Sequence, residues 1–174
     1  MGLEEGMLSE QSKAEIQKIR AEYPDQESAL LPALYLAQRD FGGWLPPEAF
    51  DQVAAAMDLP AARVAAVASF YTMFHRQPVG KHVIQVCTNI SCSLLGAEHL
   101  VTYIGRKLGI APGETTEDGE FTLLEAECLG SCGTAPMMQV DDAYYERLDE
   151  EKVDQILRSL GGSAAAQEEE GKRV

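Results

Sequence analysis

The stretch HVIQVCTNISCSLLG, residues 82–96, marks a change of pattern along the chain. Its first six residues, HVIQVC, are an apolar, strand-like run, whereas LLGAEHLVTYIGRKLG has the spacing of a helix that ends at Gly109. Cys87 and Cys92 lie on the short polar loop that joins the two, with four residues between them. A strand, a loop and a helix in this order predict the beginning of a mixed α/β unit.

The residues that follow continue the mixed pattern. A turn-rich loop comes next, and three further strands are predicted at FTLLEAEC, MMQVDD and AYYERL. A final helix is expected from about Asp149 to Leu160. The predicted order is β-α-β-β-β-α over residues 81–160, a small mixed sheet with helices packed on it. Residues 161–174 contain few apolar side chains, so we expect a disordered tail there.

Residues 1–80 have a helical pattern instead. Four short helices are predicted, beginning near Ser12, Ser28, Pro47 and just after Pro60. The first carries a capping-box pattern, Ser12 followed by Glu15, and the fourth is expected to continue toward Phe74. The predicted fold class is therefore α+β, with an N-terminal helical bundle that serves for docking, followed by the small α/β domain.

Composition and charge limit the compartment and the partners. The chain has 174 residues, and its apolar runs are shorter than the ~20 residues that a membrane helix needs. The N-terminus MGLEEGMLSEQ lacks the features of a secretory signal, so we expect a cytoplasmic location without direct membrane insertion. Twenty-eight acidic against fourteen basic residues give a net charge of −14. This charge argues against nucleic acid as a partner, because nucleic acid is bound largely through Lys and Arg.

The other two cysteines, Cys128 and Cys132, lie 35 residues after the first pair in the segment ECLGSCGTAP. Both loops are rich in glycine and small polar residues, whose N–H and hydroxyl groups can hydrogen-bond to sulfur. In a reducing cytoplasm, an even number of cysteines favours metal binding or redox chemistry over disulfides. Cys92 also precedes a helix predicted to begin near Leu94, where the helix dipole lowers the pKa of a thiol. These features bias the first pair, Cys87 and Cys92, toward thiolate.

The spacing of the cysteines leaves three occupants open: an iron-sulfur cluster, a structural zinc ion, and disulfides. Four-thiolate sites serve both metals. Structural zinc prefers two residues between paired cysteines, whereas C-x4-C and C-x3-C form wider loops that can surround a two-iron cluster. Four cysteines suffice for one 2Fe-2S centre and leave none for a second. A thioredoxin-type dithiol is disfavoured, because that chemistry uses C-x-x-C.

Other patterns have simpler interpretations. Residues 48–71 resemble a helix-turn-helix, but its second helix has one basic residue, Arg63, so core packing or subunit docking is favoured over DNA binding. The three histidines, His75, His82 and His99, are not needed as cluster ligands when four cysteines are present. Pro136 precedes the third predicted strand, and the sequence leaves its peptide isomer open.

Several segments together resemble a known family, the 24 kDa subunit of respiratory NADH:quinone oxidoreductase (complex I). They are GWLPPEAF, VASFYTMF, PVGKHVIQVCTNISC and DGEFTLLEAECLGSCGTAPMMQVDDAYYERL. The resemblance runs from about residue 12 to 160 and leaves the C-terminal tail outside. It implies a helical bundle followed by a thioredoxin-like domain with one 2Fe-2S cluster. The residues at the ligand positions are Cys87, Cys92, Cys128 and Cys132.

The same resemblance implies the reaction and the partners. The sequence contains no G-x-G-x-x-G, and Gly80-Lys81 lacks the rest of a P-loop, so NADH and FMN are expected on a partner chain. The implied partners are the flavin- and NADH-binding 51 kDa subunit and further subunits of the peripheral arm of complex I. The chain would accept single electrons from that flavin, without catalytic residues of its own, in a translocase peripheral to the inner membrane.

Two alternatives accompany this interpretation. The first is the equivalent diaphorase subunit of an NAD-linked hydrogenase or formate dehydrogenase, which also resembles this chain. The second belongs to another class, a non-redox zinc-binding adaptor whose cysteines are structural.

Overall fold

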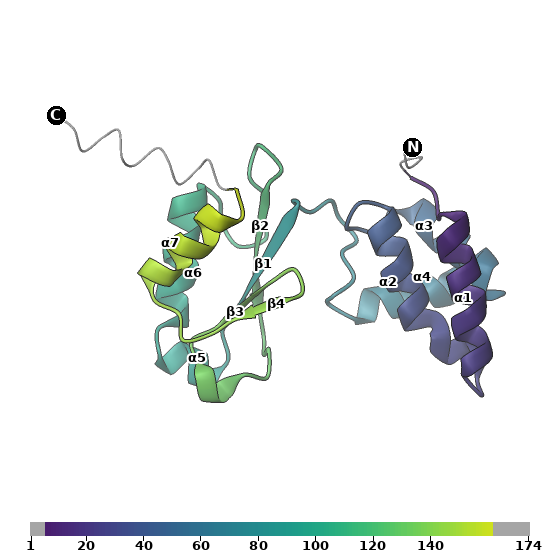
Figure 1. Ribbon diagram of the computed structural model, residues 1–174, viewed down its shortest axis with the longest axis horizontal. Coiled ribbons are helices and arrows are strands. Elements are labelled where there is room, and N and C mark those ends of the chain that lie inside the picture. The colour runs from purple at the N-terminus through teal and green to yellow at the C-terminus, as the bar shows by residue number, and fades with distance from the viewer. Residues whose placement is uncertain (1–5, 162–174) are drawn as a thin grey trace. The chain divides into compact units, whose positions relative to one another are not determined.

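The computed structural model describes residues 6–161, and the chain separates into two compact units that divide between Pro78 and Val79 (Figure 1). The first unit is helical, and the second contains a small four-stranded mixed sheet with helices. The predicted α+β fold class is therefore confirmed. The predicted tail, apart from Gly161, lies outside the described residues.

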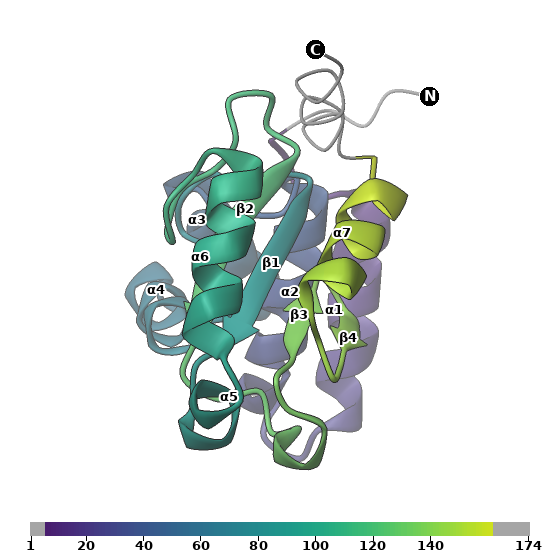
Figure 2. The ribbon, with the colours of Figure 1, turned by 90° about the vertical axis from the view of Figure 1, so that its left-hand side faces the viewer.

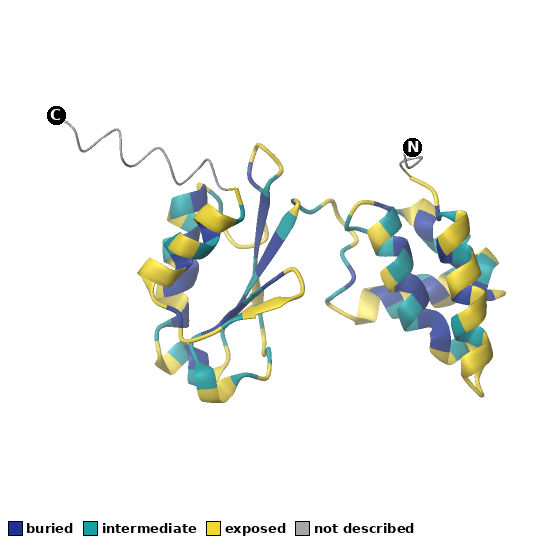
Figure 3. Cartoon of the chain, viewed as in Figure 1, coloured by how far each residue is buried: buried dark blue, intermediate teal, exposed yellow. Residues whose placement is uncertain are grey.

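Four helices and a short 3₁₀ helix form the first unit. They are α1 (Glu10–Glu22), η1 (Gln26–Ala29), α2 (Leu30–Asp40), α3 (Pro47–Met57) and α4 (Ala61–Phe70). Each helix has a buried face and an exposed face, as Figure 3 shows. The buried faces meet in one hydrophobic core to which all four helices contribute, with Ile16, Leu34, Val53 and Val64 among its fully buried residues.

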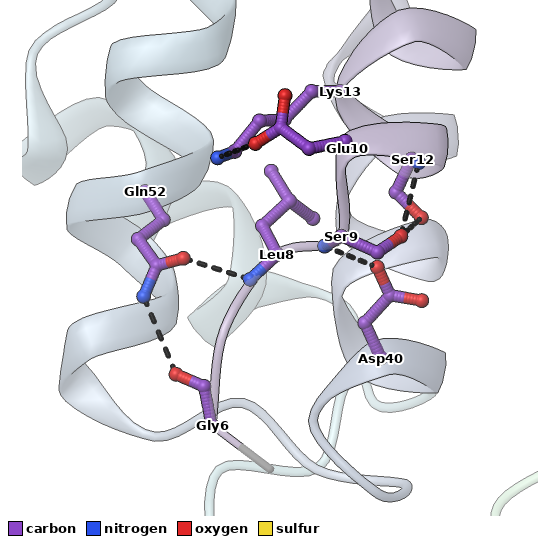
Figure 4. Close-up of polar contacts among 8 residues, drawn as sticks. All are labelled: Gly6, Leu8, Ser9, Glu10, Ser12, Lys13, Asp40 and Gln52. Atoms are coloured by element: carbon purple, nitrogen blue, oxygen red, sulfur yellow. Dashed lines mark hydrogen bonds and ion pairs between the residues drawn. The ribbon is translucent and has the colours of Figure 1, made fainter. Parts of the chain in front are cut away.

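The first helix begins earlier than the capping box predicted. Its N-cap is Ser9, whose hydroxyl accepts a hydrogen bond from the backbone N–H of Ser12 (Figure 4). Ser12 itself is buried within the helix. Long-range contacts fix this start, because Asp40 accepts the N–H of Ser9 and Gln52 accepts the N–H of Leu8. The N-cap assignment to Ser12 was therefore wrong.

We expect Ser9→Ala to lower the free energy of unfolding of the helical unit by about 1 kcal/mol. The substitution removes the oxygen that accepts the N–H of Ser12, and an N–H in the first turn has no partner within its own helix. Urea denaturation followed by far-UV circular dichroism measures the change. Ser9→Thr keeps the hydroxyl and serves as the control; equal stability of Ser9→Ala and Ser9→Thr would contradict the assigned cap.

The fourth helix ends at Phe70 rather than near Phe74, as the sequence predicted. Tyr71 has extended backbone angles, φ −94° and ψ 122°. By leaving the helix here, the chain brings Phe74 into the core, where its ring packs edge-to-face on Tyr35 at 5.1 Å between centroids. Packing of one aromatic side chain thus outweighs continuation of the helical pattern, and Phe70 is left exposed.

The second unit is built on a sheet with strand order β2-β1-β3-β4. The strands are β1 (His82–Cys87), β2 (Phe121–Ala126), β3 (Met138–Val140) and β4 (Ala143–Tyr145). β1 and β2 are parallel, whereas β3 is antiparallel to both β1 and β4. The helices are α5 (Ile90–Leu94), α6 (Ala97–Leu108) and α7 (Glu150–Ser159). Figure 2 shows α6 and α7 in front of the sheet, on the same face.

The core of the second unit lies between the sheet and these two helices. Its buried residues include Ile84, Leu123, Ile104 and Val153, one each from β1, β2, α6 and α7. The parallel register pairs Cys87, the last residue of β1, with the last residue of β2. The loops that follow β1 and β2 therefore leave the sheet at the same end, and each loop contains one cysteine pair.

The described residues include no single helix long and apolar enough to cross a membrane. Within this described part of the chain, only α3 and α4 taken together satisfy length and composition, and this pair is bent by 118°.

Candidate metal centre

The first cysteine pair is held by regular secondary structure. Cys87 ends β1, and its N–H donates to the carbonyl of Met137 at 3.2 Å. The side chain of Asn89 then caps α5 by accepting the N–H of Ile90. This short helix contains Cys92, so both cysteines are buried. The backbone of this loop is therefore fixed before any ligand is considered.

One predicted helix in this region is two helices in the structure. The helix expected from Leu94 is divided into α5 and α6, and Gly96 lies between them with φ 98°. A positive φ of this size suits glycine, which has no Cβ to clash with the backbone. Cys92 consequently lies inside a five-residue helix and not in front of a long one.

The second pair lies on a less regular loop, after β2. Cys128 and Cys132 are both exposed, and Cys132 begins the 3₁₀ helix η2 (Cys132–Thr134). Gly130, between the two cysteines, has φ 78° and so also occupies the left-handed region. The peptide bond between Ala135 and Pro136 is cis, which answers the question that the sequence left open.

The two loops bring their thiols together. All four cysteines are free, and the thiol of Cys87 interacts with those of Cys92 and Cys128. Cys92 in turn experiences the charges of Cys87 and Cys132. Between residues 6 and 161, no three His, Cys, Asp or Glu side chains are placed to hold a single metal ion. A 2Fe-2S cluster distributes four cysteine thiolates over two irons, and the four free thiols supply the donor set that it requires.

The two buried thiols ionise differently. Burial raises the pKa of Cys92 to about 11, and the neighbouring Cys87 adds to this increase. Burial also acts to raise the pKa of Cys87, but hydrogen bonds from the N–H groups of Asn89 and Leu129 and from two thiols outweigh it, and the pKa is lowered. Cys87 is therefore the first of the pair to ionise. The expectation that a helix terminus biases Cys92 toward thiolate was wrong, because burial dominates there.

Backbone groups, and not serine hydroxyls, are the main hydrogen-bond donors to the buried sulfur atoms. These donors are the N–H groups of Asn89, Leu129 and Met137. Two loop hydroxyls that were expected to face sulfur are engaged elsewhere: Ser93 donates to Glu98, and Ser131 donates to Glu146. A hydroxyl has one proton to donate, so neither can serve a sulfur at the same time.

The surroundings of the thiols include residues that the sequence did not indicate. Met137 and Ala97 are completely buried against Cys87 and Cys92. Met137 looks like an ordinary strand residue in the sequence, and its carbonyl and N–H both contact the first pair only because the loop before β3 passes beside it. No local signal marks this role.

The histidines and acidic pairs lie in ordinary polar contacts. Nδ1 of His82 is 2.7 Å from a carboxylate oxygen of Asp141, and Nε2 of His99 is 2.7 Å from one of Glu150. His82 begins β1, whereas Cys87 ends it, so this histidine lies at the opposite end of the sheet from the thiols. The contacts connect elements of the second unit and explain these residues without a ligand.

A small mixed sheet with helices on one face and four neighbouring free thiols at one end defines the class of thioredoxin-like iron-sulfur proteins. The family model described as Thioredoxin-like [2Fe-2S] ferredoxin matches residues 16–161, and this chain belongs to that family. The resemblance stated from the sequence is confirmed.

Relatives with high identity carry a consistent name, since they are the same subunit of NADH-quinone oxidoreductase. The chain is 45% identical over 148 residues to that subunit, in the form designated E 2, from Rhizobium meliloti (strain 1021), covering 85% of this chain and 88% of that protein. It is 49% identical over 132 residues to the form designated E from Rickettsia felis, covering 76% of this chain and 79% of that protein.

Among solved structures, the chain is similar to part of an NAD+-reducing [NiFe]-hydrogenase in the H2-reduced state. The TM-score is 0.67 and the sequence identity 25%, over 77% of this chain. The match covers only 22% of the hydrogenase chain, so the present chain corresponds to a small part of that protein.

Proposed function

We propose that this chain holds one 2Fe-2S cluster and serves as an electron-transfer subunit. The proposed ligands are Cys87, Cys92, Cys128 and Cys132. The observation that carries the proposal is the convergence of two cysteine loops at one end of the sheet, where thiols from both loops interact. Membership of a 2Fe-2S ferredoxin family supports the same occupant.

The chain's own groups would hold and tune the site. When bound, such a cluster takes up and releases one electron at a time. Cys87 and Cys92 would supply the buried side, where N–H groups directed at sulfur stabilise negative charge. Cys128 and Cys132 would supply the exposed side, which is the side open to a redox partner. The net charge of −14 opposes reduction, and the N–H groups favour it.

We further propose that the chain works as the 24 kDa-type subunit of an NADH:quinone oxidoreductase. The support is the 45–49% identity to NADH-quinone oxidoreductase subunits over most of both chains. The sequence lacks a dinucleotide-binding fingerprint, so FMN and NADH are assigned to a partner of the 51 kDa type. In this proposal the chain accepts single electrons from that flavin and joins other peripheral-arm subunits at the cytoplasmic side of the inner membrane.

A second host complex has an observation in its favour. The structural similarity to an NAD+-reducing hydrogenase is compatible with the equivalent subunit of an NAD-linked hydrogenase or formate dehydrogenase. The identity of 25% is well below that to the quinone-linked relatives, which is why we place that host second. Isolation of the chain with its native partners, followed by assays with quinone and with hydrogen, distinguishes the hosts.

Metal analysis and electron paramagnetic resonance (EPR) test the proposed cluster. We expect the chain purified anaerobically to contain about two irons and two sulfides and to give a spin-half EPR signal after reduction by dithionite. The same preparation should contain little zinc. One zinc per chain and no EPR signal would instead identify the cysteines as structural and favour the zinc-binding adaptor.

A further inference from the structure

The loop with the exposed cysteines is held in place by a neighbouring segment, residues 144–148. This segment contains the end of β4 and the residues before α7. The hydroxyl of Tyr144 donates to the carbonyl of Leu129 at 2.8 Å, and the N–H of Arg147 donates to the carbonyl of Thr134 at 2.8 Å. Residues on both sides of Cys132 are thus attached to the same segment.

Glu146 makes the most direct of these attachments. One carboxylate oxygen, Oε1, accepts hydrogen bonds from the hydroxyls of Ser131 and of Thr134, the latter at 2.6 Å. The two hydroxyls are themselves 2.7 Å apart, so the three side chains form one cluster. Ser131 precedes Cys132 and Thr134 follows it by two residues, so Glu146 holds the backbone on either side of this cysteine.

The four cysteines differ in how their positions are fixed. Cys87 belongs to the β1 ladder and Cys92 to α5, and both are buried. Cys132 is exposed and begins a three-residue 3₁₀ helix that has no side-chain cap. Its position therefore depends on contacts such as those of Glu146 far more than the positions of the buried pair do.

We propose that Glu146 is a positioning residue that holds Cys132 in place for the 2Fe-2S cluster. The inference rests on the proposed function, since it takes Cys132 as a ligand. Hydrogen bonds from Ser131 and Thr134 lower the pKa of Glu146, so the acceptor is a carboxylate at neutral pH, and charge-assisted hydrogen bonds are the stronger kind. Groups that orient metal ligands in this way commonly change metal retention by roughly 10- to 100-fold when removed.

The test compares three variants of the full chain, each purified anaerobically with its cluster. Glu146→Ala removes the acceptor. Glu146→Gln removes the charge but keeps an amide oxygen that can accept both hydroxyls. Glu117→Ala removes an exposed carboxylate from the loop before β2, at the other end of the sheet, and serves as the matched control. The two readouts are the rate of iron loss to an excess of chelator, followed by visible absorption, and the EPR line shape.

We expect Glu146→Ala to lose iron about 10-fold faster than the wild type and to show altered EPR g-values. Glu146→Gln should restore both readouts most of the way, and Glu117→Ala should match the wild type. Wild-type rates and line shape in Glu146→Ala would overturn the inference, as would equally fast loss from the alanine and glutamine variants. Failure of the proposed function is a separate result, because the wild type would then contain no 2Fe-2S cluster.

Discussion

Replacing Cys87 by alanine is expected to abolish the visible absorption and the EPR signal of the chain while its helices persist. Cys87 interacts with a thiol from each loop, Cys92 and Cys128, so its removal takes away one of four ligands and the contact between the two pairs. The first unit does not depend on this residue, because its core consists entirely of residues before Pro78. Far-UV circular dichroism should therefore retain the helical signal.

A matched substitution in the same loop completes this experiment. Ser91→Ala changes a neighbouring hydroxyl and leaves all four thiols in place, so its absorption and EPR signal should equal those of the wild type. Retained absorption in Cys87→Ala would remove Cys87 from the proposed ligand set. Loss of the helical signal together with the absorption would contradict a helical unit that is stable on its own.

The parts of the fold that could be predicted are those with a strong local pattern. β1 and β2 are apolar runs bounded by turn residues, and α6 ends at Gly109, where φ is 71°. The cysteine pairs were placed together for a similar reason, because each follows an apolar strand and parallel neighbours end at the same edge. Local pattern and register thus suffice for the outline of the candidate site.

The parts that were missed depend on residues distant in the sequence. Ser9 and Ser12 are both acceptable N-caps by local pattern, and contacts from Asp40 and Gln52, more than 25 residues away, decide for Ser9 (Figure 4). Glu146 reaches its two hydroxyl donors across the turn between β3 and β4, and nothing in the sequence around it marks that role.

The ionisation of the thiols shows the same limit at the candidate metal centre. A helix near Cys92 predicted a lowered pKa, because the helix dipole is a local property. Burial is set by the whole second unit, and at Cys92 it raises the pKa to about 11. The sequence can therefore propose which residues form the site more reliably than it can assign their protonation.

The two hydrophobic cores lead to a prediction on stability. Leu34 is fully buried in the core of the first unit, and Leu123 is fully buried in the core of the second. We expect Leu34→Ala to lower the free energy of unfolding of the helical unit by about 3 kcal/mol, from lost burial and the cavity left behind. The cluster, if its ligands are those proposed, should be unaffected because they all lie in the second unit.

Leu123→Ala provides the reciprocal variant, since it removes the same atoms from the other core. Thermal unfolding followed at once by far-UV circular dichroism and by visible absorption separates the two effects. Leu34→Ala should shift the helical transition to lower temperature and leave the loss of absorption unchanged, whereas Leu123→Ala should bring the loss of absorption to lower temperature. If both signals move together in both variants, the chain unfolds as one cooperative unit despite its two cores, and stability of the candidate metal centre then depends on the helical unit as well.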